Sequence, residues 1–163
     1  MPASRTAEGE RLGGFIYGTI VALAVVVDGA RAFPDSTGPV AVLVATTAAV
    51  FWCAHVYADG LAHSVSRDER LRPSELVHIA RREFSLVQAA LGPVVALLLG
   101  AVGVLSTAGS YWAAFAFGFA VLVGRGLQFA RIERLGMVGT LGVVAGNVAI
   151  GLALVGLKIV AMH

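Results

Sequence analysis

Five long apolar stretches, each close to the length of a membrane-crossing helix, constrain the fold of this chain more than any other feature. They cover about residues 13–30, 39–58, 84–105, 111–130 and 137–161. A helix needs about 20 mainly apolar residues to cross the hydrocarbon core, and an open sheet would leave backbone groups unpaired in lipid. A barrel would instead show shorter, alternating segments. The sequence therefore predicts an all-α, polytopic membrane protein with a bundle of five transmembrane helices.

Composition supports this prediction and excludes several other classes of protein. Hydrophobic residues make up 58% of the 163 residues and charged residues 13%, whereas soluble domains have about 45–50% and about 25%. A disordered chain, a disulfide scaffold and an ordinary soluble enzyme are excluded. Cys53 is the one cysteine, which excludes an internal disulfide and a thiolate metal cluster. The basic residues form no cluster with aromatic ones, so we expect no nucleic-acid partner.

The distribution of basic residues predicts the orientation of the spans. Nine of them fall in the N-terminal tail and in the connections on its side, and two, Arg31 and Lys158, fall on the other side. Cytoplasmic segments carry an excess of Lys and Arg. We therefore expect a multi-pass protein of the cell membrane, with a cytoplasmic polar tail at residues 1–12, a single transmembrane domain over residues 13–163 and an extracytoplasmic C-terminus.

An amphipathic helix is predicted between the second and third spans, over residues 73–87. Apolar residues recur there at helical spacing at Leu76, Ala80, Phe84 and Val87. Glu75, His78 and Arg82 share the other face, and Ser74 is a candidate for the N-cap. This pattern is typical of a helix that lies in the membrane interface. Further on, Gly92-Pro93 predicts a bend within the third span.

The densest polar feature lies at the end of the second span, in His55-Val-Tyr-Ala-Asp59-Gly-Leu-Ala-His63. Residues four apart share a helix face, and imidazole and carboxylate at that spacing can bind one divalent metal ion. Because His63 is about 12 Å from His55 along a helix axis, one ion can take at most two adjacent members. The alternative is a polar helix end whose His and Asp side chains face headgroups and water.

Arg125 lies near the cytoplasmic end of the fourth span, where an unpaired charge would cost several kcal/mol. Asp59 is expected at the same depth on another span, so we predict an Asp59–Arg125 pair. The alternative is an arginine whose long side chain reaches the interface without a partner.

Two further polar residues are candidates for ion binding. Asn147 lies near the middle of the fifth span, where it could bond another helix or coordinate a cation through its carbonyl oxygen. Asp28 lies near the outer end of the first span, three residues before Arg31. It could form a local ion pair or attract cations at the outer surface.

Small residues four apart recur in three spans, at Gly14 and Gly18, at Ala120 and Gly124, and at Gly142 and Gly146. Such spacing lets helix backbones approach closely within a chain or between copies. We therefore expect a homo-oligomer.

Two motifs carry a resemblance to a known family. Arg11-x-x-x-Phe15, followed by Phe51-Trp52-x-x-His55, resembles the first two helices of the bacterial relatives of the lysosomal potassium channel. In topology alone, five spans with a charged helical segment after the second are similar to the vacuolar iron transporter family. The whole chain most resembles small actinobacterial integral membrane proteins that carry no assigned activity. The two named families imply cation conduction or metal-ion transport.

The functional hypothesis is a small cation or metal-ion channel or transporter. His55 and Asp59 would line its cytoplasmic mouth, and Asn147 would lie at the midplane. The residues offer no nucleophile–base set, so we expect neither an enzyme nor a cofactor. The alternative is a non-transporting membrane scaffold or accessory subunit. A small-molecule efflux protein is a third possibility.

Overall fold

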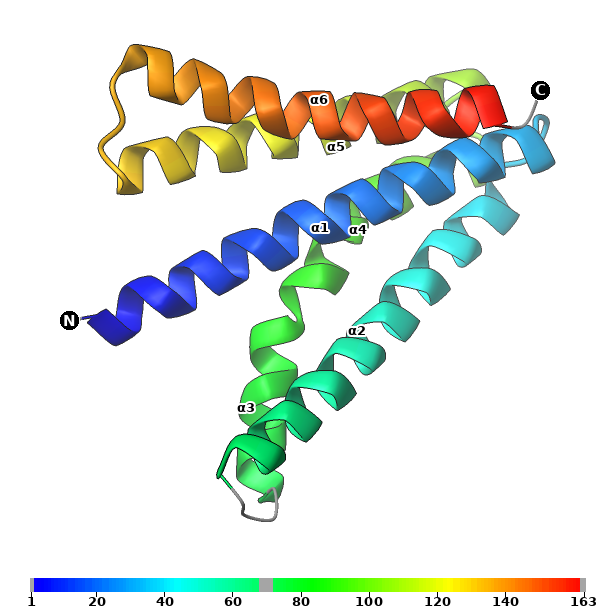
Figure 1. Ribbon diagram of the computed structural model, residues 1–163. Coiled ribbons are helices and arrows are strands. Elements are labelled where there is room, and N and C mark those ends of the chain that lie inside the picture. Colours follow the sequence, from blue (N-terminus) through cyan, green and yellow to red (C-terminus); the bar gives the residue numbers. More distant parts are fainter. Residues whose placement is uncertain (1, 68–71, 162–163) are drawn as a thin grey trace.

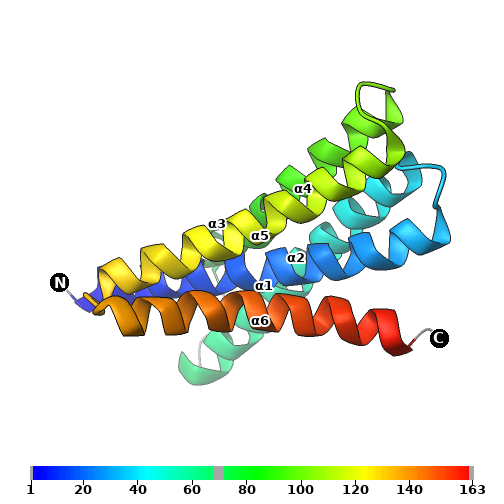
Figure 2. The same cartoon turned by 90° about the horizontal axis from the view of Figure 1, so that it is seen from above.

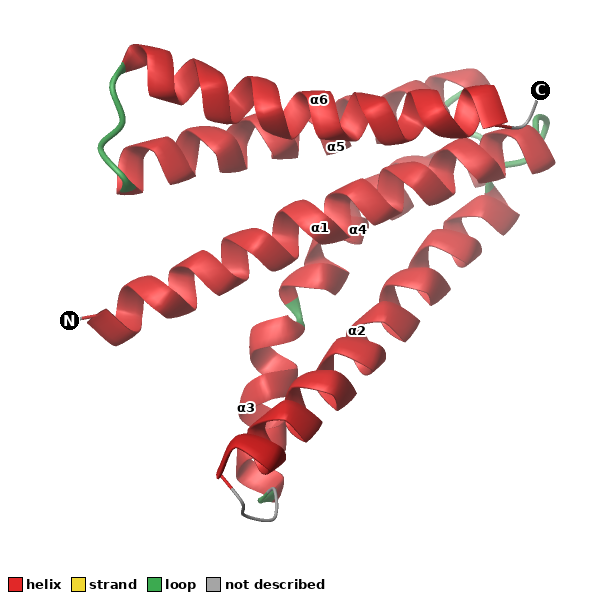
Figure 3. Ribbon diagram, viewed as in Figure 1, coloured by secondary structure: helices red, strands yellow, loops and turns green. Residues whose placement is uncertain are grey.

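The computed structural model describes residues 2–67 and 72–161, and within them the chain forms six α-helices and no strand (Figures 1 and 3). The helices are α1 (Pro2–Ala32), α2 (Gly38–Arg67), α3 (Pro73–Glu83), α4 (Ser85–Ala101), α5 (Thr107–Ile132) and α6 (Met137–Ala161). The prediction of an all-α protein is therefore confirmed. Residues 2–12, expected as a polar tail, are the first turns of α1, and α2 continues nine residues past the expected end of the second span.

Several helices could span a membrane, but the described residues do not reach the predicted count of five. Arg11–Ala32, Gly38–Val65 and Thr107–Ile132 are long and apolar enough, and α3 with α4, bent by 40°, would make a fourth. In α6 the apolar stretch found among the described residues is Met137–Ala153, which is short for a span. The count is thus corrected to three, or four with the bent pair.

The third expected span is shorter than predicted because α4 ends at Ala101. The backbone N–H groups of Val102 and Val104 donate to the carbonyls of Leu98 and Leu99, and Gly103 has φ +78°. These bonds close the helix through a left-handed glycine, a common way to end one. Residues 102–105 are apolar but lie outside the helix.

The helices run between two ends of the molecule. The N-terminus and the α5–α6 connection lie at one end, and the α1–α2 connection, the α4–α5 connection and the last turn of α6 lie at the other (Figures 1 and 2). Among the described residues α1 contacts all five other helices, whereas α6 contacts α1 and α5 alone. The second half of α2 leaves the bundle together with α3 (Figure 1).

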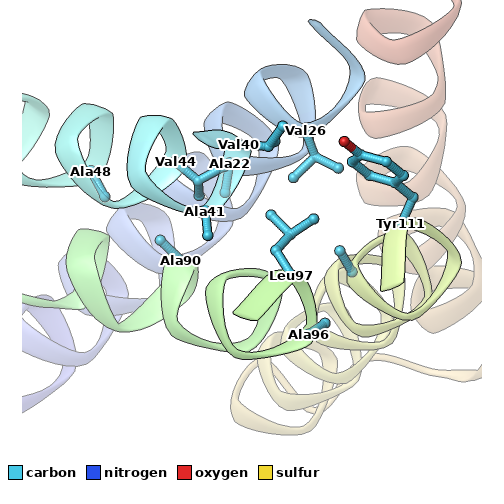
Figure 4. Packing of buried hydrophobic residues seen from close by; sticks show 11 residues of the cluster. Ala22, Val26, Val40, Ala41, Val44, Ala48, Ala90, Ala96, Leu97 and Tyr111 are labelled. Atoms are coloured by element: carbon cyan, nitrogen blue, oxygen red, sulfur yellow. The ribbon is translucent and has the colours of Figure 1, made fainter. Parts of the chain in front are cut away.

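The core lies at the end that holds the α1–α2 connection (Figure 4). Val26, Val40 and Leu97 are fully buried there, between small residues of α1, α2, α4 and α5. The Tyr111 hydroxyl donates to the carbonyls of Phe33 and Ser36, at 2.9 and 3.1 Å. The tyrosine thereby ties the start of α5 to the α1–α2 connection.

Close backbone approach is used in one of the three small-residue motifs. A Cβ atom on Gly18 would lie 2.9 Å from the carbonyl oxygen of Leu86, so α1 and α4 touch at this point. By contrast, Gly124, Gly142 and Gly146 have no neighbour within 4 Å of that position. These two motifs on α5 and α6 are therefore not used for packing within the chain.

The predicted amphipathic helix is divided in two. Its first part is α3, with Ile79 buried, and the chain bends by 40° before α4 begins at Ser85. Ser74 is inside α3 rather than at its N-cap, which is Arg72, and the Arg72 N–H donates to Glu75 Oε2 at 3.0 Å. α4 continues as one helix through Pro93, so the large bend lies at the α3–α4 junction instead.

Candidate functional site

The α2–α3 hairpin gathers most of the polar residues that the sequence singles out. Its contacts involve Trp52, Asp59 and His63 of α2, which are seven and four residues apart and therefore share one face. That face meets α3, as the second half of α2 and α3 run side by side (Figure 1). The hairpin is the candidate site because ionisable side chains from two helices meet there.

Polar contacts between α2 and α3 hold the hairpin together. Trp52 Nε1 donates to the Ala80 carbonyl at 2.9 Å, and the Trp52 ring meets Phe84 edge to face. The Arg82 guanidinium pairs with the Asp59 carboxylate. Nearer the 68–71 connection, His63 Nε2 lies 3.7 Å from Glu75 Oε1.

Arg82 is the central cation of this site. Besides Asp59 it contacts its neighbour Glu83, with Nε donating to Oε1 at 3.0 Å. The Arg82 and Asp59 side chains are 27% and 40% exposed. Water therefore screens the pair, which holds the helices in register more than it stabilises the fold.

A shallow groove of about 300 Å³ opens beside these contacts. It is lined by His63, Ser74, Glu75, His78, Ile79 and Arg82. Imidazole, carboxylate and guanidinium groups thus border one small volume. Chemically, the groove can accept a small polar ligand or ordered water.

The structure does not bring Asp59 and Arg125 together. Arg125 Nη1 donates to Gln128 Oε1 at 2.8 Å, and its guanidinium carbon lies 4.0 Å from the ring centroid of Phe15. This cation–π contact and the local hydrogen bond take the place of the predicted carboxylate. Asp59 and Arg125 do not meet because their helices have different neighbours. At Asp59, α2 lies beside α3, whereas Arg125 faces α1.

His55 lies apart from Asp59, in an aromatic cluster between α1 and α2. Its Nδ1–H donates to the Phe51 carbonyl at 2.9 Å, since a carbonyl oxygen can only accept. The ring centroid lies 5.6 Å from that of Tyr17 and 6.4 Å from that of Phe51. The residues that carry the resemblance to the potassium channel relatives therefore include two members of this cluster.

The three predicted metal ligands turn towards different neighbours. His55 faces Tyr17, Asp59 pairs with Arg82, and His63 approaches Glu75. Within residues 2–67 and 72–161, no three His, Cys, Asp or Glu side chains are placed to hold one metal ion. The three residues follow one another at intervals of four along α2, but Tyr17 belongs to α1 whereas Arg82 and Glu75 belong to α3.

Asn147 and Asp28 both have protein partners. Asn147 Nδ2 donates to the Leu122 carbonyl at 3.4 Å, a long bond that links α6 to α5. Asp28 is half-buried near the C-terminal end of α1 and, like Arg31, takes part in interactions within the protein.

Sequence reasoning missed Arg82 as the partner of Asp59 and Trp52 as a hydrogen-bond donor to α3. One signal was present. Asp59 lies nine residues before the 68–71 connection and Arg82 lies eleven residues after it, so an antiparallel hairpin brings them close. The sequence pattern instead places Arg82 on the polar face of an interfacial helix, with Glu75 and His78.

Comparison with known proteins gave no match: no family model, no curated protein and no solved structure matches the chain.

Proposed function

We propose that this protein is an integral protein of the cell membrane that acts as a non-enzymatic scaffold or accessory subunit. One observation carries the proposal: the side chains that a permeation pathway would need are engaged between helices. Asp59 pairs with Arg82, His63 approaches Glu75, and Asn147 bonds α5. Polar groups used in this way give a helical membrane protein its specific arrangement.

The partner of Asp59 supports a structural role for this carboxylate. A cation that bound Asp59 would compete with the Arg82 guanidinium, which also contacts Glu83. Water screens this partly exposed pair, so its main contribution is to join α2 to α3 in one register. Ion binding at this position would therefore compete with the contact that joins α2 to α3.

We further propose that the N-terminus is cytoplasmic and that the two ends of the chain lie on opposite sides of the membrane. The position of the last turn of α6, at the end opposite the N-terminus, supports an odd number of crossings (Figures 1 and 2). Reporter fusions at Ala3 and His163 test this topology, and cytoplasmic activity at both sites would contradict it.

Metal binding and flux test the scaffold role. We expect no change in the melting temperature of the purified protein with saturating zinc, manganese or iron(II), for wild type or for His55→Ala. We also expect no uptake of potassium or of these metals into proteoliposomes. An increase in melting temperature that His55→Ala removes, or flux that scales with the amount of protein, would contradict the role.

Cation or metal-ion transport is the second candidate function. The hairpin groove favours it, because His63, Glu75 and His78 border one polar volume, on the side that the topology proposal makes cytoplasmic. The open Gly142 and Gly146 face of α6 supports self-association, so a pathway would form between copies. Flux that His63→Ala reduces and the exposed-site control Arg131→Gln leaves unchanged would favour transport.

A further inference from the structure

A large apolar groove opens where the end of α1 meets α5 and α6. Its volume is about 560 Å³, and Val27 and Arg31 of α1, Tyr111 and Trp112 of α5, and Leu152 of α6 are among its lining residues. Among the lining residues that the structure describes, Arg31 is the one that carries a charge. The groove therefore offers apolar walls with a single guanidinium at one end.

The groove continues along α5 and α6 into a second cavity of about 550 Å³. Phe119 and Leu152 line both cavities, and the second extends to Gly124. Thirteen residues separate Tyr111 from Gly124, which is about 20 Å along a helix. One leaflet of the hydrocarbon core is about 15 Å deep, so the groove is long enough for a single acyl chain that lies along the helices.

The charged end of the groove lies at the level of the headgroups. Arg31 is in the last turn of α1, and Tyr111 and Trp112 are near the start of α5. Tyr and Trp concentrate at membrane interfaces, and the Trp112 side chain is 75% exposed. At the opposite end of the groove, a Cβ atom on Gly124 would have no neighbour within 4 Å, so the groove is open there.

We propose that this groove binds one acyl chain of an anionic phospholipid, with the lipid phosphate against Arg31. A guanidinium donates two parallel hydrogen bonds to a phosphate, which fixes the headgroup. Arg31, like Asp28 one turn earlier on α1, takes part in interactions within the protein, and the five N–H donors of a guanidinium are enough to hold a phosphate as well. The proposal rests on the membrane location but is independent of whether the protein is a scaffold or a transporter.

Tryptophan quenching tests the proposal directly. In the Trp52→Phe variant, Trp112 is the remaining tryptophan. The variant is reconstituted in phosphatidylcholine vesicles that contain equal small fractions of brominated phosphatidylglycerol or brominated phosphatidylcholine. One arginine near an anionic lipid predicts about fivefold enrichment of the anionic lipid at the groove. Brominated phosphatidylglycerol should therefore quench Trp112 more strongly than brominated phosphatidylcholine.

Three further variants separate the groove from general surface charge. Arg31→Gln should remove the preference for the anionic lipid, and Ala116→Phe, which fills the groove, should reduce quenching by both lipids. Arg131→Gln, an exposed arginine at the opposite end of α5, should leave the preference intact.

Lipid retention on the detergent-purified protein, measured by native mass spectrometry, gives a second readout. Wild type and Arg131→Gln should retain phosphatidylglycerol, and Arg31→Gln should retain less. Equal quenching of Trp112 by the two lipids, or equal retention by wild type and Arg31→Gln, would overturn the proposal. Neither outcome would bear on the flux and metal experiments above.

Discussion

The two halves of α2 are held by different means. Its first half packs by shape: Val40 and Val44 are buried against Leu97 of α4 and the small residues of α1 (Figure 4). Its second half is held by polar contacts with α3, centred on Asp59 and Arg82. The comparison shows how one long helix can be fixed rigidly at one end and joined at the other by contacts that water or a partner can replace.

The largest effect should come from the packed end. Leu97 is fully buried in the core, so Leu97→Ala should lower the free energy of unfolding by about 2–5 kcal/mol. Unfolding in mixed detergent micelles measures the change. Leu98→Ala is the matched control, because Leu98 is 46% exposed, and it should cost much less. Equal effects would show that this end is not packed as described.

The close contact of α1 with α4 should give the next largest effect. In Gly18→Ala the new methyl group would lie 2.9 Å from the Leu86 carbonyl oxygen, and a helix backbone cannot easily shift. We expect a loss of about 1–3 kcal/mol in the free energy of unfolding. Gly142→Ala meets nothing within 4 Å and should be neutral or stabilise by up to about 1 kcal/mol. A destabilised Gly142→Ala would instead indicate a partner on α6.

Tyr111 tests how the packed end is tied to its connection. Tyr111→Phe keeps the ring but removes the hydrogen bonds to the carbonyls of Phe33 and Ser36. The expected loss in the free energy of unfolding is about 0.5–1.5 kcal/mol. Hydrogen exchange should also become faster in residues 33–37 and not in α3. Unchanged exchange in the connection would contradict the tie.

The smallest effect should come from the hairpin. Because the Asp59 and Arg82 side chains are 40% and 27% exposed, their coupling in a double-mutant cycle should be about 0.2–1 kcal/mol. The cycle uses Asp59→Asn and Arg82→Gln. The same cycle with Arg125→Gln in place of Arg82→Gln should be additive. Coupling of Asp59 to Arg125 would restore the pair that the sequence predicted.

The sequence predicted helices well because their signals are local. Apolar length alone located both ends of α5 and α6, the start of α2 and the end of α1 to within four residues. It missed the start of α1 and the end of α2, where polar residues extend the helices. It overestimated the third span, because the ending at Gly103 depends on a left-handed turn inside an apolar run. It also placed a bend at Pro93, whereas the chain bends at the α3–α4 junction.

The candidate site was predicted in composition but not in pairing. Depth along a helix follows from counting residues, and this placed Asp59 and Arg125 at one level. Which neighbour a helix face meets depends on the lateral order of helices, which residue counting does not contain. For the same reason His55, Asp59 and His63 share a helix yet meet Tyr17, Arg82 and Glu75.

A cross-linking measurement in native membranes tests the α2–α3 pairing most directly. Cys53 is exposed, so it is first replaced in Cys53→Ala. In that background, Asp59→Cys with Arg82→Cys should be joined rapidly by a short, thiol-specific bifunctional reagent. Asp59→Cys with Arg125→Cys should remain unlinked under the same conditions. The reverse pattern would contradict the hairpin and the structural role that we assign to its polar residues.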